Sequence, residues 1–186
     1  MTSLLELYIS LKANIDSFSF PIPGWEGENF INTDGYHKWT ALYVKEFKPK
    51  RILELGRRNG NSLYALAYFL DDKSVIDSYD IYDCGNVVNK PNVNIIVYDG
   101  DYTKLDYNLY DFIFVDINGG GNKEYEILQL INKSKFDGIS LWDDIGTTWC
   151  PNVNFWDKVT NNKLETDLHG KNNFGIIKHE NFSFRI

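Results

Sequence analysis

Acidic residues close a series of short apolar segments in this sequence. If these segments are parallel strands of one sheet, their carboxyl ends lie at one edge, and open α/β sheets bind their ligands there. A rim of carboxylates suits a cationic or hydroxyl-rich ligand and repels a phosphate. A single acid in such a place is usually a turn former or a helix cap, but five successive acidic strand ends favour a ligand site. The acids are Glu54, Asp80, Asp101, Asp116, Asp143 and Asp144.

The segment 51–62 contains the first of these acids and a glycine-rich turn. Its apolar residues predict a short strand, and Gly56 and Gly60 mark the turn. A helix is expected to begin at Asn61 or Ser62, and glycines before a helix N-terminus let a ligand approach the backbone closely. A plain structural turn would show the same glycines. Their spacing differs from the Gly-x-Gly-x-x-Gly pattern, which disfavours a nucleotide-dependent oxidoreductase.

Helices and strands alternate along the rest of the chain. Apolar residues at helical spacing predict helices over 3–16, 39–47, 124–132 and 155–159. Apolar runs predict strands over 74–81, 93–97, 110–116 and 136–144, and C-terminal strands over 163–168, 174–178 and 182–186 that include an antiparallel pair. This alternation predicts a doubly wound, mostly parallel sheet with helices on both faces.

Composition limits the class of protein. The chain has 186 residues, of which 43% are hydrophobic, and this fits a single globular domain. We expect an N-terminal helix and a cap segment on the substrate side in 1–35, and the core of the domain in 36–186. The N-terminus lacks the basic lead of a signal peptide, and no segment is apolar enough to span a membrane.

Charge and cysteine content limit the partners and the compartment. The net charge is −7, and no basic cluster extends beyond 48–51, so a nucleic-acid partner is not expected. Cys84 and Cys150 are isolated from each other and from any histidine at metal-binding spacing. They are interpreted as reduced thiols, which predicts a cytoplasmic protein.

In this order, the segments resemble the class I S-adenosylmethionine (SAM)-dependent methyltransferases, and within them the small O-methyltransferase branch of catechol-type and macrolide-sugar enzymes. The resemblance covers roughly residues 36–178. It rests on the first motif at 52–62, the turn at 99–102, the strand at 110–116 and the segment at 136–144. It implies a Rossmann-like seven-stranded sheet with an antiparallel C-terminal strand.

The resemblance also implies which residues bind SAM. Asp80 would hold the ribose hydroxyls through charge-assisted hydrogen bonds, and Ile81 and Tyr102 would flank the adenine. Arg57 and Arg58 depart from the small residues often found in this turn of the family. The Arg58 guanidinium can pair with the methionyl carboxylate, or both arginines can be solvated surface residues. The implied cofactor residues are Glu54, Gly56, Arg58, Asn59, Gly60, Ser62, Asp80, Ile81, Asp101, Tyr102 and Asp116.

Metal-dependent relatives bind a divalent cation at positions that correspond here to Asp116, Asp143 and Asp144. Three hard oxygen ligands suit Mg²⁺ or Mn²⁺, and these acids are therefore assigned both catalytic and metal-binding roles. In the alternative, Asp116 contacts cofactor or substrate, and the other two acids cap the next segment.

One departure from the resemblance concerns the general base. Many relatives carry a histidine shortly after the acid of the fourth strand, whereas 117–121 contains none. Base catalysis is then expected from His37 or from metal activation alone, and the alternative for His37 is a structural or surface histidine. The missing histidine keeps a second hypothesis open, namely a catalytically silent SAM-binding module.

The expected function is O-methylation of a small polar acceptor. The acidic pair and the flanking tryptophans suit a hydroxylated ring, so a sugar or another glycan is the first choice. A homo-oligomer is compatible with this hypothesis. The tryptophans are Trp25, Trp39, Trp142 and Trp149.

Overall fold

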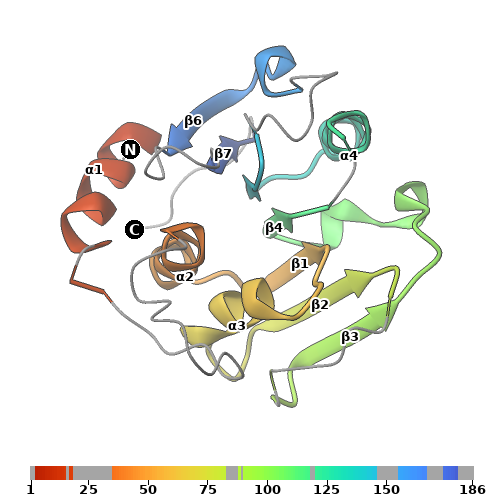
Figure 1. The fold of residues 1–186 in the computed structure, drawn as a ribbon, viewed down its shortest axis with the longest axis horizontal. Helices are drawn as coiled ribbons and strands as arrows, with labels where there is room; N and C mark the ends of the chain where they lie inside the picture. The colour runs from red at the N-terminus through yellow and green to blue at the C-terminus, as the bar shows by residue number, and fades with distance from the viewer. Residues whose placement is uncertain are drawn as a thin grey trace.

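The computed structural model describes residues 3–15, 17–18, 35–82, 88, 90–117, 120–145, 155–166 and 174–179. Its centre is a seven-stranded sheet with the order β3-β2-β1-β4-β5-β7-β6 (Figure 1). The first five strands are parallel, and β7 is antiparallel to β5 and β6, so the predicted Rossmann-like α/β fold is confirmed. The strands are β1 (Arg51–Leu55), β2 (Val75–Asp80), β3 (Val93–Val97), β4 (Phe112–Val115), β5 (Ile139–Trp142), β6 (Asn162–Thr166) and β7 (Phe174–Lys178).

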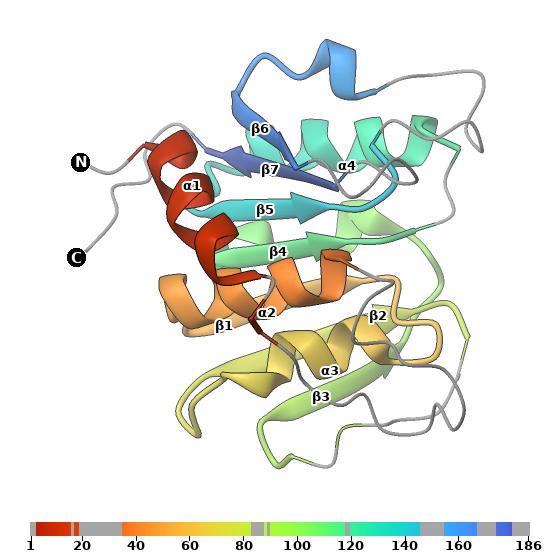
Figure 2. The same cartoon turned by 60° about the vertical axis from the view of Figure 1, so that its left-hand side comes forward.

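Helices cover both faces of this sheet. Figures 1 and 2 show α1, α2 and α3 on one face and α4 on the other, which is the doubly wound arrangement. The segment 155–159, predicted to be helical, contains a single 3₁₀ turn. The helices are α1 (Leu4–Ile15), α2 (Gly35–Phe47), α3 (Asn61–Tyr68) and α4 (Asn122–Lys133), with 3₁₀ turns η1 (Tyr102–Lys104), η2 (Tyr107–Leu109) and η3 (Trp156–Lys158).

Two hydrophobic cores lie on the two faces of the sheet, because successive residues of a strand point to opposite faces. In β1, Ile52 packs with Leu63 of α3, whereas Leu53 and Leu55 pack on the side of α4. Each of these side chains is fully buried, which stabilises the fold by roughly 2 kcal/mol apiece. The same alternation directs Glu54 toward α3.

Several strand boundaries differ from the prediction by one to three residues, and β5 differs most. β5 begins at Ile139 rather than at residue 136 and ends at Trp142 rather than at residue 144. Just before it, Gly138 passes so close to Asp111 that a Cβ there would lie 2.3 Å from the Asp111 carbonyl oxygen. The strand predicted over 182–186 lies outside the described residues.

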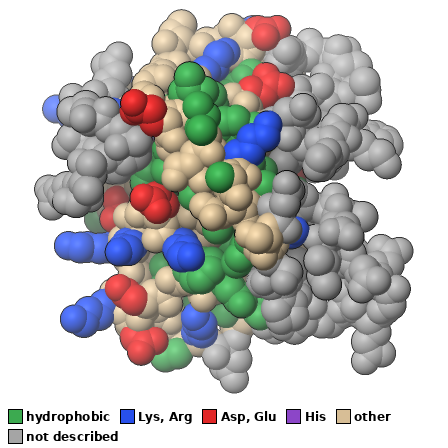
Figure 3. All heavy atoms as spheres, turned by 90° about the vertical axis from the view of Figure 1, so that its left-hand side faces the viewer, with side chains coloured by type: hydrophobic (Ala, Val, Ile, Leu, Met, Phe, Trp, Pro, Cys, Tyr) green, Lys and Arg blue, Asp and Glu red, His purple; other side chains and the backbone are tan. Residues whose placement is uncertain are grey.

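The surface shown in Figure 3 carries mixed charge. Lys and Arg side chains lie there among Asp and Glu side chains, with hydrophobic groups between them. In the described segments, every helix is too short or too polar to cross a bilayer.

Candidate functional site

The glycine-rich turn after β1 has a left-handed backbone at three positions. The φ angles of Gly56, Arg58 and Gly60 are 89°, 46° and 83°. A Cβ on Gly56 would lie 1.8 Å from the carbonyl oxygen of Asp116, so only glycine fits. The turn therefore packs directly on the residue that follows β4. As predicted, α3 begins at Asn61.

Asp80, the last residue of β2, binds this turn through backbone N–H groups. Arg57 N and Arg58 N donate to its Oδ2 at 2.8 and 2.7 Å, and Tyr82 N donates to its Oδ1 at 2.9 Å. Burial alone would raise the pKa of Asp80, but these hydrogen bonds outweigh burial and hold the pKa below its usual range. A carboxylate has about four acceptor sites, so about one stays open to a ribose hydroxyl. The ribose contact itself stays a prediction.

Glu54 lies beneath the turn and is fully buried. Ser62 Oγ of α3 donates to its Oε1 at 2.7 Å, and Ser78 Oγ of β2 donates to its Oε2. Burial raises the pKa of Glu54 to about 7, although the two serines act in the opposite direction. From the sequence, Glu54 was expected among the acids at the ligand-binding edge of the sheet. Strand alternation instead turns its side chain toward α3. Cofactor contacts of Glu54 and Ser62 stay predictions.

The two arginines of the turn have opposite environments. Arg57 is 1% exposed, and its Nη1 and Nη2 donate to the carbonyl oxygens of Ser78 and Tyr82 at 3.5 and 3.4 Å. Arg58 and Asn59 are exposed at the tip of the turn. The alternative that both arginines are surface residues is therefore wrong for Arg57. Sequence patterns missed it, because a charged residue in a turn gives no sign of burial.

Three carboxylates, hereafter the carboxylate trio (Asp116, Asp143 and Asp144), meet where β4 and β5 end. Each offers one oxygen, and these oxygens lie within 4.8 Å of one another. Asp116 N donates to Leu55 O at 2.9 Å, and Asp143 N donates to Val115 O at 3.0 Å. These hydrogen bonds extend the parallel ladders and fix the separation of the acids, so the predicted meeting of the three residues is found.

The carboxylate trio is electrostatically unfavourable by itself. Burial, and then the neighbouring charge of Asp144, raise the pKa of Asp116 to about 7. Asp144 has a left-handed backbone with φ 57°, and its buried Oδ1 has no hydrogen-bond partner within the described part of the chain. A buried oxygen without a partner is costly, and a bound ion or a water molecule would satisfy it.

The segment after β3 packs beside the end of β2. A Cβ on Gly100 would lie 3.5 Å from Cγ2 of Ile81, whose side chain is half exposed. Asp101 caps η1 by accepting a hydrogen bond from Thr103 N at 3.1 Å, so this acid does act as a cap. Tyr102 is buried. Cofactor contacts of these residues stay predictions.

His37 is buried in the first turn of α2. Its ring centroid lies 3.9 Å from that of Tyr36, which lies 6.1 Å from the ring of Phe174. Since the next residue, Gly175, pairs with Trp142, this turn lies near the carboxyl end of β5. Burial lowers the pKa of His37 to about 4, so the imidazole is neutral at pH 7 but a weak base. Its catalytic role stays a prediction.

The fold matches those of solved methyltransferases. The S-adenosylhomocysteine (SAH)-bound methyltransferase PaMTH1 of Podospora anserina has a TM-score of 0.61 and 18% identity, over 97% of this chain and 98% of that chain. An SAH-bound O-methyltransferase of Bacillus cereus has a TM-score of 0.57 and 17% identity, over 94% and 88%. The SAM-bound O-methyltransferase TomG of Streptomyces achromogenes, involved in tomaymycin synthesis, has 0.56 and 16%, over 96% and 97%.

These likenesses define the class of fold, which is that of the SAM-dependent O-methyltransferases. No protein-family profile and no curated protein matches the sequence.

Proposed function

We propose that this protein is a SAM-dependent methyltransferase that acts on a hydroxyl of a small polar acceptor. One contact carries the proposal: Gly56 of the glycine-rich turn packs on the backbone of Asp116 in the carboxylate trio. A cofactor on the turn would thus lie beside a hydroxyl held by the trio. In the reaction, an oxygen–carbon bond forms while the sulfur–carbon bond of SAM breaks, and SAH and a proton are released. Such a transfer gains chiefly from near-attack geometry.

The cofactor contacts are assigned around the turn. Asp80 accepts a hydrogen bond from a ribose hydroxyl at its remaining acceptor site, and Ile81 flanks the adenine. The exposed Arg58 guanidinium pairs with the methionyl carboxylate. The negative charge of the carboxylate trio stabilises the sulfonium. PaMTH1 and the Bacillus cereus enzyme hold SAH and TomG holds SAM, which supports this choice of cofactor.

The carboxylate trio fits a divalent cation. A cation would relieve the repulsion that raises the pKa of Asp116, and it would give Asp144 Oδ1 a partner. The donor set consists of hard carboxylate oxygens, which suits Mg²⁺ or Mn²⁺. When bound, such an ion orients the acceptor hydroxyl and lowers its pKa.

A sugar or another glycan is the proposed acceptor, but the tryptophans do not support this choice. Trp39 and Trp142 are 3% and 0% exposed and belong to the two cores, so they do not line an open pocket. Trp25 and Trp149 lie outside the described residues. Support comes instead from the carboxylate trio, because carboxylates and a hard cation suit paired hydroxyls.

A silent SAM-binding module is the second candidate. Two observations favour it. Ile117, the residue after Asp116, supplies no proton acceptor, and the buried His37 imidazole is a weak base. The two candidates agree on cofactor binding and differ in turnover.

Calorimetric titration with SAH tests the proposal. Asp80→Ala should weaken SAH binding by roughly 100-fold, because it removes the ribose acceptor and the anchor of the turn. Asp143→Ala should keep SAH affinity but lose the thermal stabilisation that Mn²⁺ gives to the unaltered protein. The matched control is Asp106→Ala, which removes an exposed cap of η2 and should change neither result.

Each assignment fails separately. Normal SAH affinity of Asp80→Ala would refute the cofactor site, and full Mn²⁺ stabilisation of Asp143→Ala would refute the metal site. Transfer of a labelled methyl group from SAM to a panel of hydroxylated acceptors separates an enzyme from a silent module.

A further inference from the structure

Arg57 is a buried charge to which the proposed reaction gives no role. Its side chain is 1% exposed, its two hydrogen bonds are long, and its Nε has no partner in the described segments. A buried guanidinium with incomplete hydrogen bonds costs stability. Its own hydrogen bonds therefore do not explain an arginine at this position, and the acids beside it are the remaining explanation.

The contacts of Arg57 lie on both sides of Asp80. Its guanidinium donates to the carbonyl oxygen of Ser78, two residues before this acid, and to that of Tyr82, two residues after it. Its backbone N donates to the Asp80 carboxylate itself at 2.8 Å. Its positive charge contributes to the low pKa of Asp80 and partly opposes the rise in the pKa of Glu54 that burial causes. Arg57 thus contacts three residues at or just after the carboxyl end of β2, namely Ser78, Asp80 and Tyr82.

We propose that Arg57 is a positioning residue for the cofactor, which fixes the Asp80 carboxylate in the orientation that accepts the ribose. This inference rests on the proposed function. Without the guanidinium, the carbonyl groups of Ser78 and Tyr82 each lose one donor, and the backbone on both sides of Asp80 is held less firmly.

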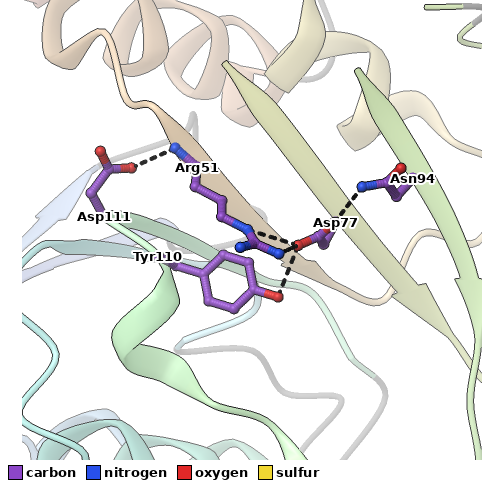
Figure 4. Close-up of polar contacts among 5 residues, drawn as sticks. All are labelled: Arg51, Asp77, Asn94, Tyr110 and Asp111. Carbon is purple, nitrogen blue, oxygen red and sulfur yellow. Dashed lines mark hydrogen bonds and ion pairs between the residues drawn. The ribbon is translucent and has the colours of Figure 1, made fainter. Parts of the chain in front are cut away.

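The chain offers a matched control at the opposite end of the same strands. Arg51 begins β1 and pairs with Asp77 of β2, with Nη2 and Oδ2 2.7 Å apart (Figure 4). Arg57 follows β1 and contacts the carboxyl end of β2. Arg51→Met therefore removes the same charge from the same pair of strands, away from the turn.

The experiment compares two ligands by calorimetry at a temperature where every variant is folded. One ligand is SAH, and the other is its 2′-deoxy analogue, which lacks one ribose hydroxyl. Arg57→Met should bind SAH roughly tenfold more weakly and should discriminate less between the two ligands. Arg57→Lys, which keeps the charge, should recover part of both properties. Arg51→Met should lower the melting temperature but keep the affinity and the discrimination.

Unchanged SAH affinity and discrimination in Arg57→Met would overturn the inference, as would equal losses in Arg51→Met, because a loss of stability alone would then explain them. If Arg57→Met does not fold, Arg57→Gln replaces it, with donors kept and charge removed. If the unaltered protein does not bind SAH, the proposed function fails and the inference fails with it.

Discussion

At the amino end of the parallel strands, Asp77 accepts hydrogen bonds from Arg51 at 2.7 and 3.1 Å, from Asn94 at 2.7 Å and from the Tyr110 hydroxyl at 3.0 Å (Figure 4). At the carboxyl end, the carboxylate trio has three like charges whose oxygens lie within 4.8 Å. The first cluster pairs one buried acid with a cation and two neutral donors. The second gathers three acids, and the positive charge of Arg58 offsets only part of what raises the pKa of Asp116.

The pKa values of the two clusters move in opposite directions. Burial alone would raise the pKa of Asp77, but its hydrogen bonds with Asn94, Arg51 and Tyr110 outweigh burial and lower it. At the other end, burial and the Asp144 charge raise the pKa of Asp116 to about 7. The Asp77 cluster thus contributes to stability, whereas the carboxylate trio costs stability, which is the pattern expected of the ligand site proposed above.

The largest expected effect is a loss of stability when the hydrogen bonds of Asp77 at the amino end are removed. Asp77→Ala should lower the free energy of unfolding by about 2–3 kcal/mol, because it leaves Arg51 and two neutral donors without an acceptor. The value lies below that of a fully buried pair, since Arg51 is partly exposed and water replaces some of its contacts. Urea unfolding followed by circular dichroism measures the loss.

The same variant tests whether the two ends are independent. SAH affinity should stay within about threefold of the unaltered protein, because distant sites without shared partners act additively. A larger drop in affinity would show that the amino end helps to shape the cofactor site. Asp77→Asn, which keeps the shape and one acceptor oxygen, should lose less stability.

The sequence predicted the meeting of the carboxylate trio because it depends on strand order and register. Asp116 and Asp143 directly follow Val115 and Trp142, which pair in adjacent parallel strands. Once hydrophobic runs identify the strands, that neighbourhood follows from the fold class. The alternation of helices and strands likewise predicted the doubly wound sheet.

The environments of single side chains were harder to predict. The burial of Glu54 depends on two serines contributed by other elements, and that of Arg57 depends on two carbonyl groups of the β2 end. Trp142 belongs to a core rather than to the acceptor site, and this follows from packing between layers. Local sequence patterns contain no information about such distant partners.

A smaller effect concerns the buried acid next to the turn. The pKa of Glu54 is about 7 in the folded protein, above that of an unfolded glutamate near 4.3, so the folded state binds more protons between these values. Its ionisation therefore weakens folding above pH 7, and this penalty disappears as the pH falls toward about 4.5. Glu54→Gln has no such penalty and can still hydrogen-bond both serines.

Relative to the unaltered protein, Glu54→Gln should gain about 2 kcal/mol of stability between pH 5 and pH 8, by urea unfolding. Glu46→Gln, on an exposed part of α2, is the control and should show no such trend. If the stability difference is the same at both pH values, Glu54 is ionised in the folded protein over this whole range. A raised pKa would then be a property of the carboxylate trio and not of Glu54.

The smallest expected effect is a change in stability that distinguishes repulsion among the carboxylate trio from its binding of a metal ion. Asp144→Asn removes one of three like charges, and asparagine tolerates the left-handed backbone found there. In the presence of a chelator, the variant should gain about 1 kcal/mol of stability, because its neighbours ionise more easily. With Mn²⁺ in place of the chelator, it should gain less than the unaltered protein, because it offers a weaker ligand.

The two thermal unfolding curves should therefore exchange order when Mn²⁺ replaces the chelator. Asp144→Ala provides the control, since alanine removes the charge but disfavours a positive φ, so its gain in the chelator should be smaller. If Asp144→Asn loses stability in the chelator, the acid is already compensated by its surroundings. The carboxyl end would then resemble the amino end, and the contrast between a balanced cluster and one that waits for a cation would not hold.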